Sequence, residues 1–225
     1  MGSGTTGLNV RRPLDVQRLE EAMTDRLKIG MTTYLDYLVA TGAGKLAAVQ
    51  GSIDVYASPH RPFYVDWTEA LLHGIATNTE ELTLQRCLSK QHHRPKIVNY
   101  ADLNKGWLTF RRTEKTVGLA SFAPRQWSPC QLDIKVAPEL VVQTKKGPVL
   151  VKLYYKSTPL NRDGADAGAR LLQRLYPEFD GSYAVLDVRR SVLVRPRRRN
   201  LTKFDTLLEV ESRALYDMWT KLKVA

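Results

Sequence analysis

The chain has 225 residues, and its 34 lysines and arginines outnumber 23 acids, which gives a formal charge of +11 and a pI near 9.7. With 43% hydrophobic and 25% charged residues, the composition is that of a globular protein with a real core, which excludes a disordered chain. No apolar run approaches the roughly 18 residues that a membrane span needs, so no membrane-spanning protein is expected. The charge favours an anionic partner, nucleic acid first and an acidic protein or a membrane surface next.

The cysteines and the N-terminus predict a cytoplasmic protein. Cys87 and Cys130 lie far apart without CxxC or Cys/His spacing, so we expect two free thiols in a reducing compartment and no disulfide framework or cysteine-rich zinc site. Residues 1–13 lack the apolar stretch of a signal peptide and are expected to form a flexible arm.

Residues 14–115 are predicted to be mainly helical. Apolar spacing predicts helices over 14–27 and 31–39, a loop or short strand over 45–62, and a helix capped by Asp66 with Glu69 three residues later. A further helix is expected over 79–90, headed by Asn78, and a helix running into a strand over 100–112. The TGAGK run at 41–45 follows a helix and lacks Ser or Thr after Lys45, so it is interpreted as a helix end and not as a phosphate loop.

Residues 116–225 are predicted to form an α/β core closed by a C-terminal helix, after a linker over 114–129. Two β-rich runs at 140–144 and 149–155 flank a Lys-Lys-Gly-Pro turn, which predicts a hairpin. A helix over 163–176, a strand over 183–194 and a final helix over 202–222 follow. Glu211 lies on the apolar stripe of the final helix and therefore needs a basic partner. The expected fold class is α+β, with a mixed sheet that can recruit the helix at 79–90.

Residues at defined places in this core carry a family resemblance. Pro138-Glu139 stands at the start of the first hairpin strand, and Lys152 and Lys156 stand in the second. With the order helix, hairpin, helix, strand, the segment 79–199 resembles the core of PD-(D/E)XK nucleases. The run from PELVV to YAVLDVRR is also similar to a group of uncharacterised bacterial proteins, which implies one continuous fold.

The resemblance implies a site in which two carboxylates hold Mg²⁺ or Mn²⁺ and a lysine acts beside them. Its acid position is not matched, because Leu150 and Tyr154 stand two residues before the two lysines. The core is therefore expected to be degenerate. Candidate catalytic residues are Glu139, Lys152, Lys156 and Asp187; candidate metal ligands are Glu139 and Asp133, with Glu80 or Glu81 as other sources of an acid.

Arginines cluster at the end of the predicted strand 183–194. Arginine suits bidentate phosphate contact, and Pro196 favours an exposed loop. Lys145 and Lys146 at the hairpin turn, and the segment 92–96, could extend this face. The candidate nucleic-acid-binding residues are Arg189, Arg190, Arg195, Arg197, Arg198, Arg199, Lys203, Lys145 and Lys146.

The sequence thus predicts a protein that binds DNA or RNA through a basic face on a degenerate nuclease-like core. The first alternative is a working metal-dependent nuclease of the PD-(D/E)XK type. The second is an interaction subunit whose basic loop meets an acidic protein partner in a larger complex.

Overall fold

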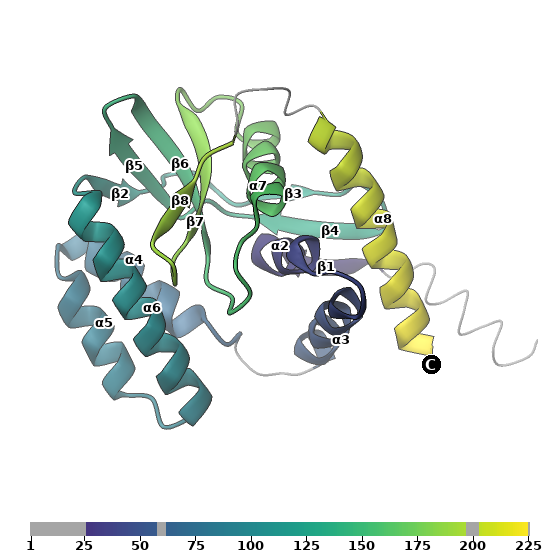
Figure 1. Cartoon of the computed structure of the whole chain (residues 1–225), viewed down its shortest axis with the longest axis horizontal. Coiled ribbons are helices and arrows are strands. Elements are labelled where there is room, and N and C mark those ends of the chain that lie inside the picture. Colours follow the sequence, from purple (N-terminus) through teal and green to yellow (C-terminus); the bar gives the residue numbers. More distant parts are fainter. Residues whose placement is uncertain (1–25, 58–61, 197–202, 225) are drawn as a thin grey trace, which may run out of the picture.

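The computed structural model describes residues 26–57, 62–196 and 203–224 of the chain. In chain order the elements are β1 (Leu27–Gly30), α2 (Met31–Val39), α3 (Ala43–Ala57), α4 (Val65–Thr77), α5 (Glu80–Ser89), α6 (Arg94–Thr113), β2 (Val117–Leu119), β3 (Arg125–Trp127), β4 (Leu132–Val136), β5 (Leu140–Thr144), β6 (Gly147–Tyr154), α7 (Arg162–Leu175), β7 (Ser182–Asp187), β8 (Val192–Val194) and α8 (Lys203–Val224). The predicted class is confirmed: the fold is mixed α/β, with a helical N-terminal region and a C-terminal helix (Figure 1). None of the described helices is both long and apolar enough to span a membrane.

A five-stranded mixed sheet, in the order β2-β5-β6-β7-β8, organises the molecule. β5 and β6 form the predicted antiparallel hairpin, whose turn is Lys145-Lys146 and whose next residue, Gly147, takes a φ of 104°. β7 then pairs in parallel with β6, because the chain crosses over through α7. β2 and β8 are antiparallel edge strands.

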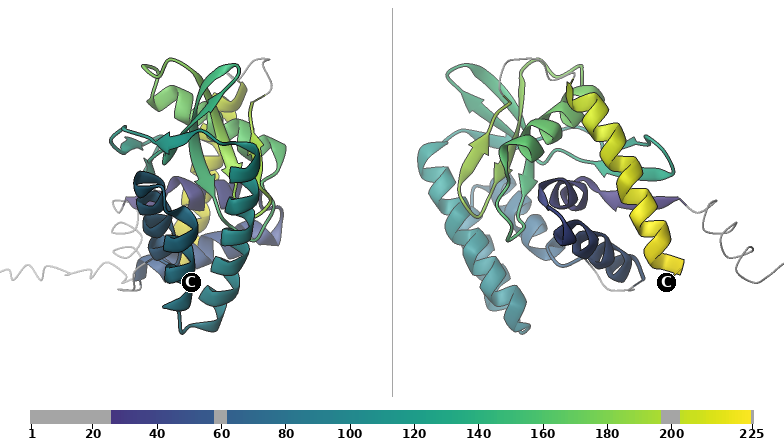
Figure 2. Two further views of the ribbon diagram at one scale, coloured as in Figure 1. Left: turned by 90° about the vertical axis from the view of Figure 1, so that its left-hand side faces the viewer. Right: turned by 45° about the vertical axis from the view of Figure 1, so that its right-hand side comes forward.

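The two faces of this sheet build two separate cores, because successive side chains of a strand point to opposite faces. In β6, Leu150 and Tyr154 belong to a core shared with α2, α7 and α8, whereas Val149, Val151 and Leu153 belong to a core shared with α4, α5 and α6. Figures 1 and 2 show α4–α6 on one side of the molecule and α2, α3 and α8 on the other. We call α4, α5 and α6 the helical arm.

A smaller sheet of three strands, in the order β1-β4-β3, completes the first core. β1 pairs in parallel with β4, so that Leu27 lies beside Leu132 although the two residues are distant in sequence. The predicted helical region therefore contributes to both cores: β1 and α2 contribute to the first, and the helical arm forms the second.

Several local predictions are wrong. Residues 45–57 belong to helix α3, not to a loop, and the predicted linker 114–129 contains β2 and β3. The strand predicted over 183–194 is two antiparallel strands, because the chain turns back at Ser191, whose φ is 57°. The helix predicted over 100–112 begins earlier, at Arg94. Asp66 does not cap α4 but lies inside its first turn and forms an ion pair with Lys96, 2.9 Å away. The predicted helix over 14–27 lies mostly outside the described residues, and its last residue belongs to β1.

Helix α6 is fixed to the turn between β7 and β8 by close backbone contact. A Cβ atom on Gly106 would lie 2.0 Å from the carbonyl oxygen of Val188. The Ser191 hydroxyl donates to the Gly106 carbonyl (2.7 Å), and Arg189 donates to Asp102 (3.1 Å). The second core thus depends on a glycine that no residue with a side chain can replace without a shift of the helix.

The C-terminal helix α8 forms the ion pair that the sequence predicts for Glu211. Glu211 accepts a hydrogen bond from Lys45 of α3, 2.6 Å away, and both side chains keep about a fifth of their surface exposed. The predicted basic partner of Glu211 is therefore confirmed.

Candidate functional site

Glu139 and Lys152, the acid and the lysine that the resemblance singled out, form a buried ion pair with each other. They meet because Glu139 directly precedes β5 and Lys152 lies on the adjacent strand β6. The side chains are 9% and 7% exposed. The second carboxylate oxygen of Glu139 accepts the backbone N–H of Leu153 at 2.8 Å. Both carboxylate oxygens of Glu139 therefore already accept hydrogen bonds from within the protein.

Burial dominates the electrostatics of this pair. It raises the pKa of the Glu139 carboxyl, against the opposing effects of the Lys152 ammonium and the Leu153 N–H. Burial alone would lower the pKa of Lys152, but Glu139, together with Tyr155 and Tyr176, opposes this effect and the pKa of Lys152 is raised. Because both side chains are buried and paired with each other, neither Glu139 nor Lys152 is exposed to a water that it could deprotonate.

Asp133, the other proposed metal ligand, lies in the smaller sheet and is held by different partners. Arg26 donates to it from Nε (3.1 Å), and the Ser128 hydroxyl donates at 2.8 Å. The hydrogen bond from Arg26 holds the pKa of Asp133 below its ordinary value. The two proposed metal ligands thus pair with different cations, Glu139 with Lys152 beside the five-stranded sheet and Asp133 with Arg26 beside the three-stranded sheet.

Replacing Asp133 by asparagine should lower the urea midpoint of unfolding at pH 7, because the charge that pairs with Arg26 is lost. A carboxyl whose pKa is lower in the folded state stabilises that state above about pH 4, and this contribution disappears as the pH falls through the folded pKa. The difference between Asp133→Asn and the wild type should therefore shrink between pH 7 and pH 3. Equal differences at both pH values would contradict this account.

Asp187 and Lys156 lie at the carboxyl ends of the parallel strands β6 and β7. Asp187 accepts from the Leu160 N–H (3.0 Å) and from Arg190 (3.2 Å), which fixes the loop after β6. Lys156 forms an ion pair with Asp36 of α2 (3.1 Å). Nothing in the sequence marks Asp36 as the partner of Lys156, since only the packing of α2 on the sheet brings the two together.

The described carboxylates do not gather into a metal centre. Within the described ranges, no three His, Cys, Asp or Glu side chains lie close enough to hold an ion. Glu80, which could have supplied an acid, forms an ion pair with Arg111 (2.9 Å). The four proposed catalytic residues thus belong to three ion pairs, Glu139–Lys152, Lys156–Asp36 and Asp187–Arg190.

Two of the predicted nucleic-acid-binding arginines form ion pairs with other residues of the protein. Arg189 is only 10% exposed, and it donates to the Tyr155 carbonyl (2.9 Å), Asn99 and Asp102. Arg190 donates to Asp187 and to the Ser157 carbonyl. The predicted position of both residues in a strand is wrong, because they lie in the turn between β7 and β8.

Other members of that set remain available. At the end of the five-stranded sheet where β6 and β7 begin, Lys145 and Lys146 are exposed and form no ion pair with a described residue. Arg195 follows β8 at the same end and is half-buried, and Lys203 is exposed at the start of α8. We call the surface that carries Lys145, Lys146, Arg195 and Lys203 the sheet end. Arg197, Arg198 and Arg199 lie outside the described residues.

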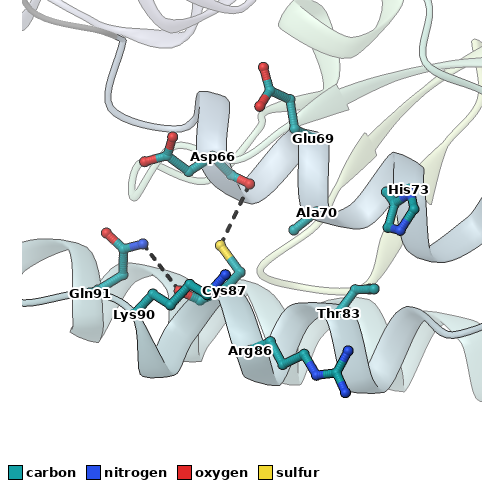
Figure 3. Close-up of a pocket in the computed structure, with 9 residues that line it drawn as sticks. All are labelled: Asp66, Glu69, Ala70, His73, Thr83, Arg86, Cys87, Lys90 and Gln91. Atoms are coloured by element: carbon teal, nitrogen blue, oxygen red, sulfur yellow. Dashed lines mark hydrogen bonds between the residues drawn. The ribbon is translucent and has the colours of Figure 1, made fainter.

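A groove of about 490 Å³ between α4 and α5 carries no reactive arrangement (Figure 3). Asp66, Glu69 and His73 stand on its α4 side, and Arg86 and Lys90 stand on its α5 side. The Cys87 thiol points at the Asp66 carbonyl oxygen, 3.5 Å away, and not at His73. Burial raises the pKa of this thiol, so it is a poor nucleophile.

Comparison with protein-family models, with curated proteins and with solved structures found no match to this chain.

Proposed function

We propose that the protein binds DNA or RNA through the sheet end, on a core that resembles a PD-(D/E)XK nuclease but has no catalytic centre. The observation that carries this proposal is the distribution of ion pairs. Lys145, Lys146, Arg195 and Lys203 have no acidic partner among the described residues, whereas Lys152, Lys156, Arg189 and Arg190 all have one. Three further arginines, at 197–199, directly follow Arg195 and Pro196 in the sequence.

The order of the elements supports the nuclease-like core, and the ion pairs support its lack of activity. The helix at 79–90 (α5) and helix α6 precede the hairpin β5–β6, with β2, β3 and β4 between them, and α7 and β7 follow it, which agrees with the order that the resemblance implies. Glu139 is placed where an acid is expected, but Lys152 and the Leu153 N–H occupy its oxygens. A divalent ion would have to displace both groups and find a second carboxylate.

Binding should be measured by fluorescence anisotropy with single-stranded and double-stranded DNA and RNA over a salt series. For duplex DNA, the slope of log K against log salt changes by about 0.9 for each phosphate contact. The triple variant Lys145→Ala, Lys146→Ala, Arg195→Ala should therefore bind at least tenfold more weakly near 0.1 M salt, with a slope reduced by about 2 to 3.

A matched control removes three cations elsewhere. Lys28, Lys135 and Lys221 are exposed and form no ion pair with a described residue. Their alanine variant has the same net charge, and its affinity should stay within about twofold of the wild type, since neither the smaller sheet nor the end of α8 is part of the proposed surface. If both triple variants lose affinity equally, the binding depends on overall charge and the assignment to the sheet end is wrong.

The same samples, incubated with Mg²⁺ or Mn²⁺ and run on a gel, test the rival nuclease function. Intact substrate agrees with the proposal. Metal-dependent cleavage that Glu139→Gln abolishes would replace it. An absence of binding at about 150 mM salt would reject both nucleic-acid functions and favour an acidic protein partner.

A further inference from the structure

Helix α6 carries five cationic side chains and a single acid, Asp102, along its 20 residues. Two of the cations are engaged: Lys96 with Asp66 and Arg111 with Glu80, each at 2.9 Å. Asp102 is used by Arg189. The three remaining cations, Arg94, Lys105 and Arg112, are all exposed and form no ion pair with a described residue.

These three residues lie in one line along the helix. Arg94 and Arg112 are separated by eighteen residues, which is five turns of an α-helix, and Lys105 lies about three turns after Arg94. The line is therefore about 27 Å long at a rise of about 1.5 Å per residue. It lies opposite the buried face that Leu103, Trp107 and Phe110 present to the second core. The exposed residues Val98, Ala101 and Thr109 fill the spaces along it without adding an acid.

This line leads toward the sheet end. α6 runs from the far end of the helical arm up to β2 (Figure 1), and the exposed Lys115 lies between the helix and that strand. The Gln143 N–H donates to the Thr116 carbonyl (2.9 Å), which holds the start of β2 against the end of β5, two residues before Lys145. The C-terminal end of α6 is thus connected through Glu114, Lys115 and β2 to the end of β5 and the hairpin turn.

We infer that the outer face of α6 is a second part of the nucleic-acid surface, which follows the phosphate backbone away from the sheet end. This inference rests on the proposed function and extends it from a local patch to a track. Three cations in a line about 27 Å long match the length of about eight base pairs of duplex, at about 3.4 Å of duplex axis per base pair. The contact is with phosphates, so it carries no sequence preference.

The triple variant Arg94→Ala, Lys105→Ala, Arg112→Ala tests the track. We expect at least tenfold weaker binding to a 30-base-pair duplex near 0.1 M salt and a salt slope reduced by about 2 to 3. The alanine variant of Lys28, Lys135 and Lys221 is the control, because it loses the same charge from other surfaces. Circular dichroism and the urea midpoint establish that each variant is folded.

Length dependence gives a second readout. A short duplex of about 8 base pairs can occupy the sheet end or α6 but not both, so the wild type should favour the 30-base-pair duplex more strongly than the α6 variant does. In the wild-type complex, Lys105 should also be protected from acetylation, whereas Lys28 should not.

The outcomes separate the track from the proposed function. If the sheet-end variant loses affinity while the α6 variant binds like the control, and Lys105 is acetylated equally with and without duplex, the track is wrong and the function stands. If the wild type binds no nucleic acid, both are rejected.

Discussion

Replacing Lys152 by methionine is expected to reduce the free energy of unfolding by about 3 to 5 kcal/mol. The side chain that remains, Glu139, is 9% exposed and would keep a carboxylate in the core with only the Leu153 N–H as a partner. Removing one member of a buried pair is costly because it leaves an uncompensated charge in a medium of low dielectric constant. Urea denaturation of the variant and the wild type gives the difference directly.

The double variant Glu139→Gln, Lys152→Met separates the loss of the ion pair from the loss of packing. Glutamine keeps an oxygen that can accept the Leu153 N–H, and methionine replaces the lysine stem. Because no buried charge remains, its stability should return to within about 1 to 2 kcal/mol of the wild type. A Lys152→Met protein that unfolds within 1 kcal/mol of the wild type would show that the pair is not buried as described.

Replacing Gly106 by alanine is expected to destabilise the protein by about 2 kcal/mol or more. The new Cβ would meet the carbonyl oxygens of Val188 and Arg189, at 2.0 and 2.9 Å, and neither is a flexible side-chain end. α6 must therefore move away from the turn between β7 and β8, which weakens the hydrogen bonds of Ser191 and Arg189. Overpacking typically costs about 1 to 3 kcal/mol, and here lost hydrogen bonds add to it.

A second glycine supplies the control. Gly51 lies inside helix α3, and a Cβ built on it meets nothing within 4 Å. Gly51→Ala should stabilise the protein by about 0.4 to 1 kcal/mol, because alanine restricts the unfolded chain without a clash. Opposite signs for the two substitutions are expected in chemical or thermal unfolding. A Gly106→Ala protein as stable as Gly51→Ala would contradict the close contact of α6 with the turn.

The sequence predicts some of the residues of the candidate site but not which of them pair with each other. The sequence singles out Glu139 and Lys152 by their places at the hairpin, but the alternation of side chains cannot show that the two form an ion pair with each other. The line on α6 does not follow from the predicted helix over 100–112, because Arg94 lies before that range. Once the helix begins at Arg94, the spacing of Arg94, Lys105 and Arg112 is visible in the sequence itself.

The turn at Ser191 was missed for a different reason. Residues 183–194 are almost continuously suited to a strand, and no Gly, Pro or Asn marks the reversal. The backbone reverses there because Arg189 and Ser191 bind α6, so a contact with a distant helix replaces the usual local signal.

The sequence by itself determined the class of the fold, the hairpin, the crossover helix and the C-terminal helix, because each follows from hydrophobic periodicity and local turn chemistry. It also determined that Glu211 needed a basic partner. Only the tertiary structure decided which charges remain available to a ligand. Arg189 and Lys145 look equivalent in the sequence, yet Arg189 pairs with Asp102 of α6 and is only 10% exposed, whereas Lys145 is exposed and has no ion pair with a described residue. The difference arises because Asp102, although distant in the sequence, meets Arg189 when the second core forms.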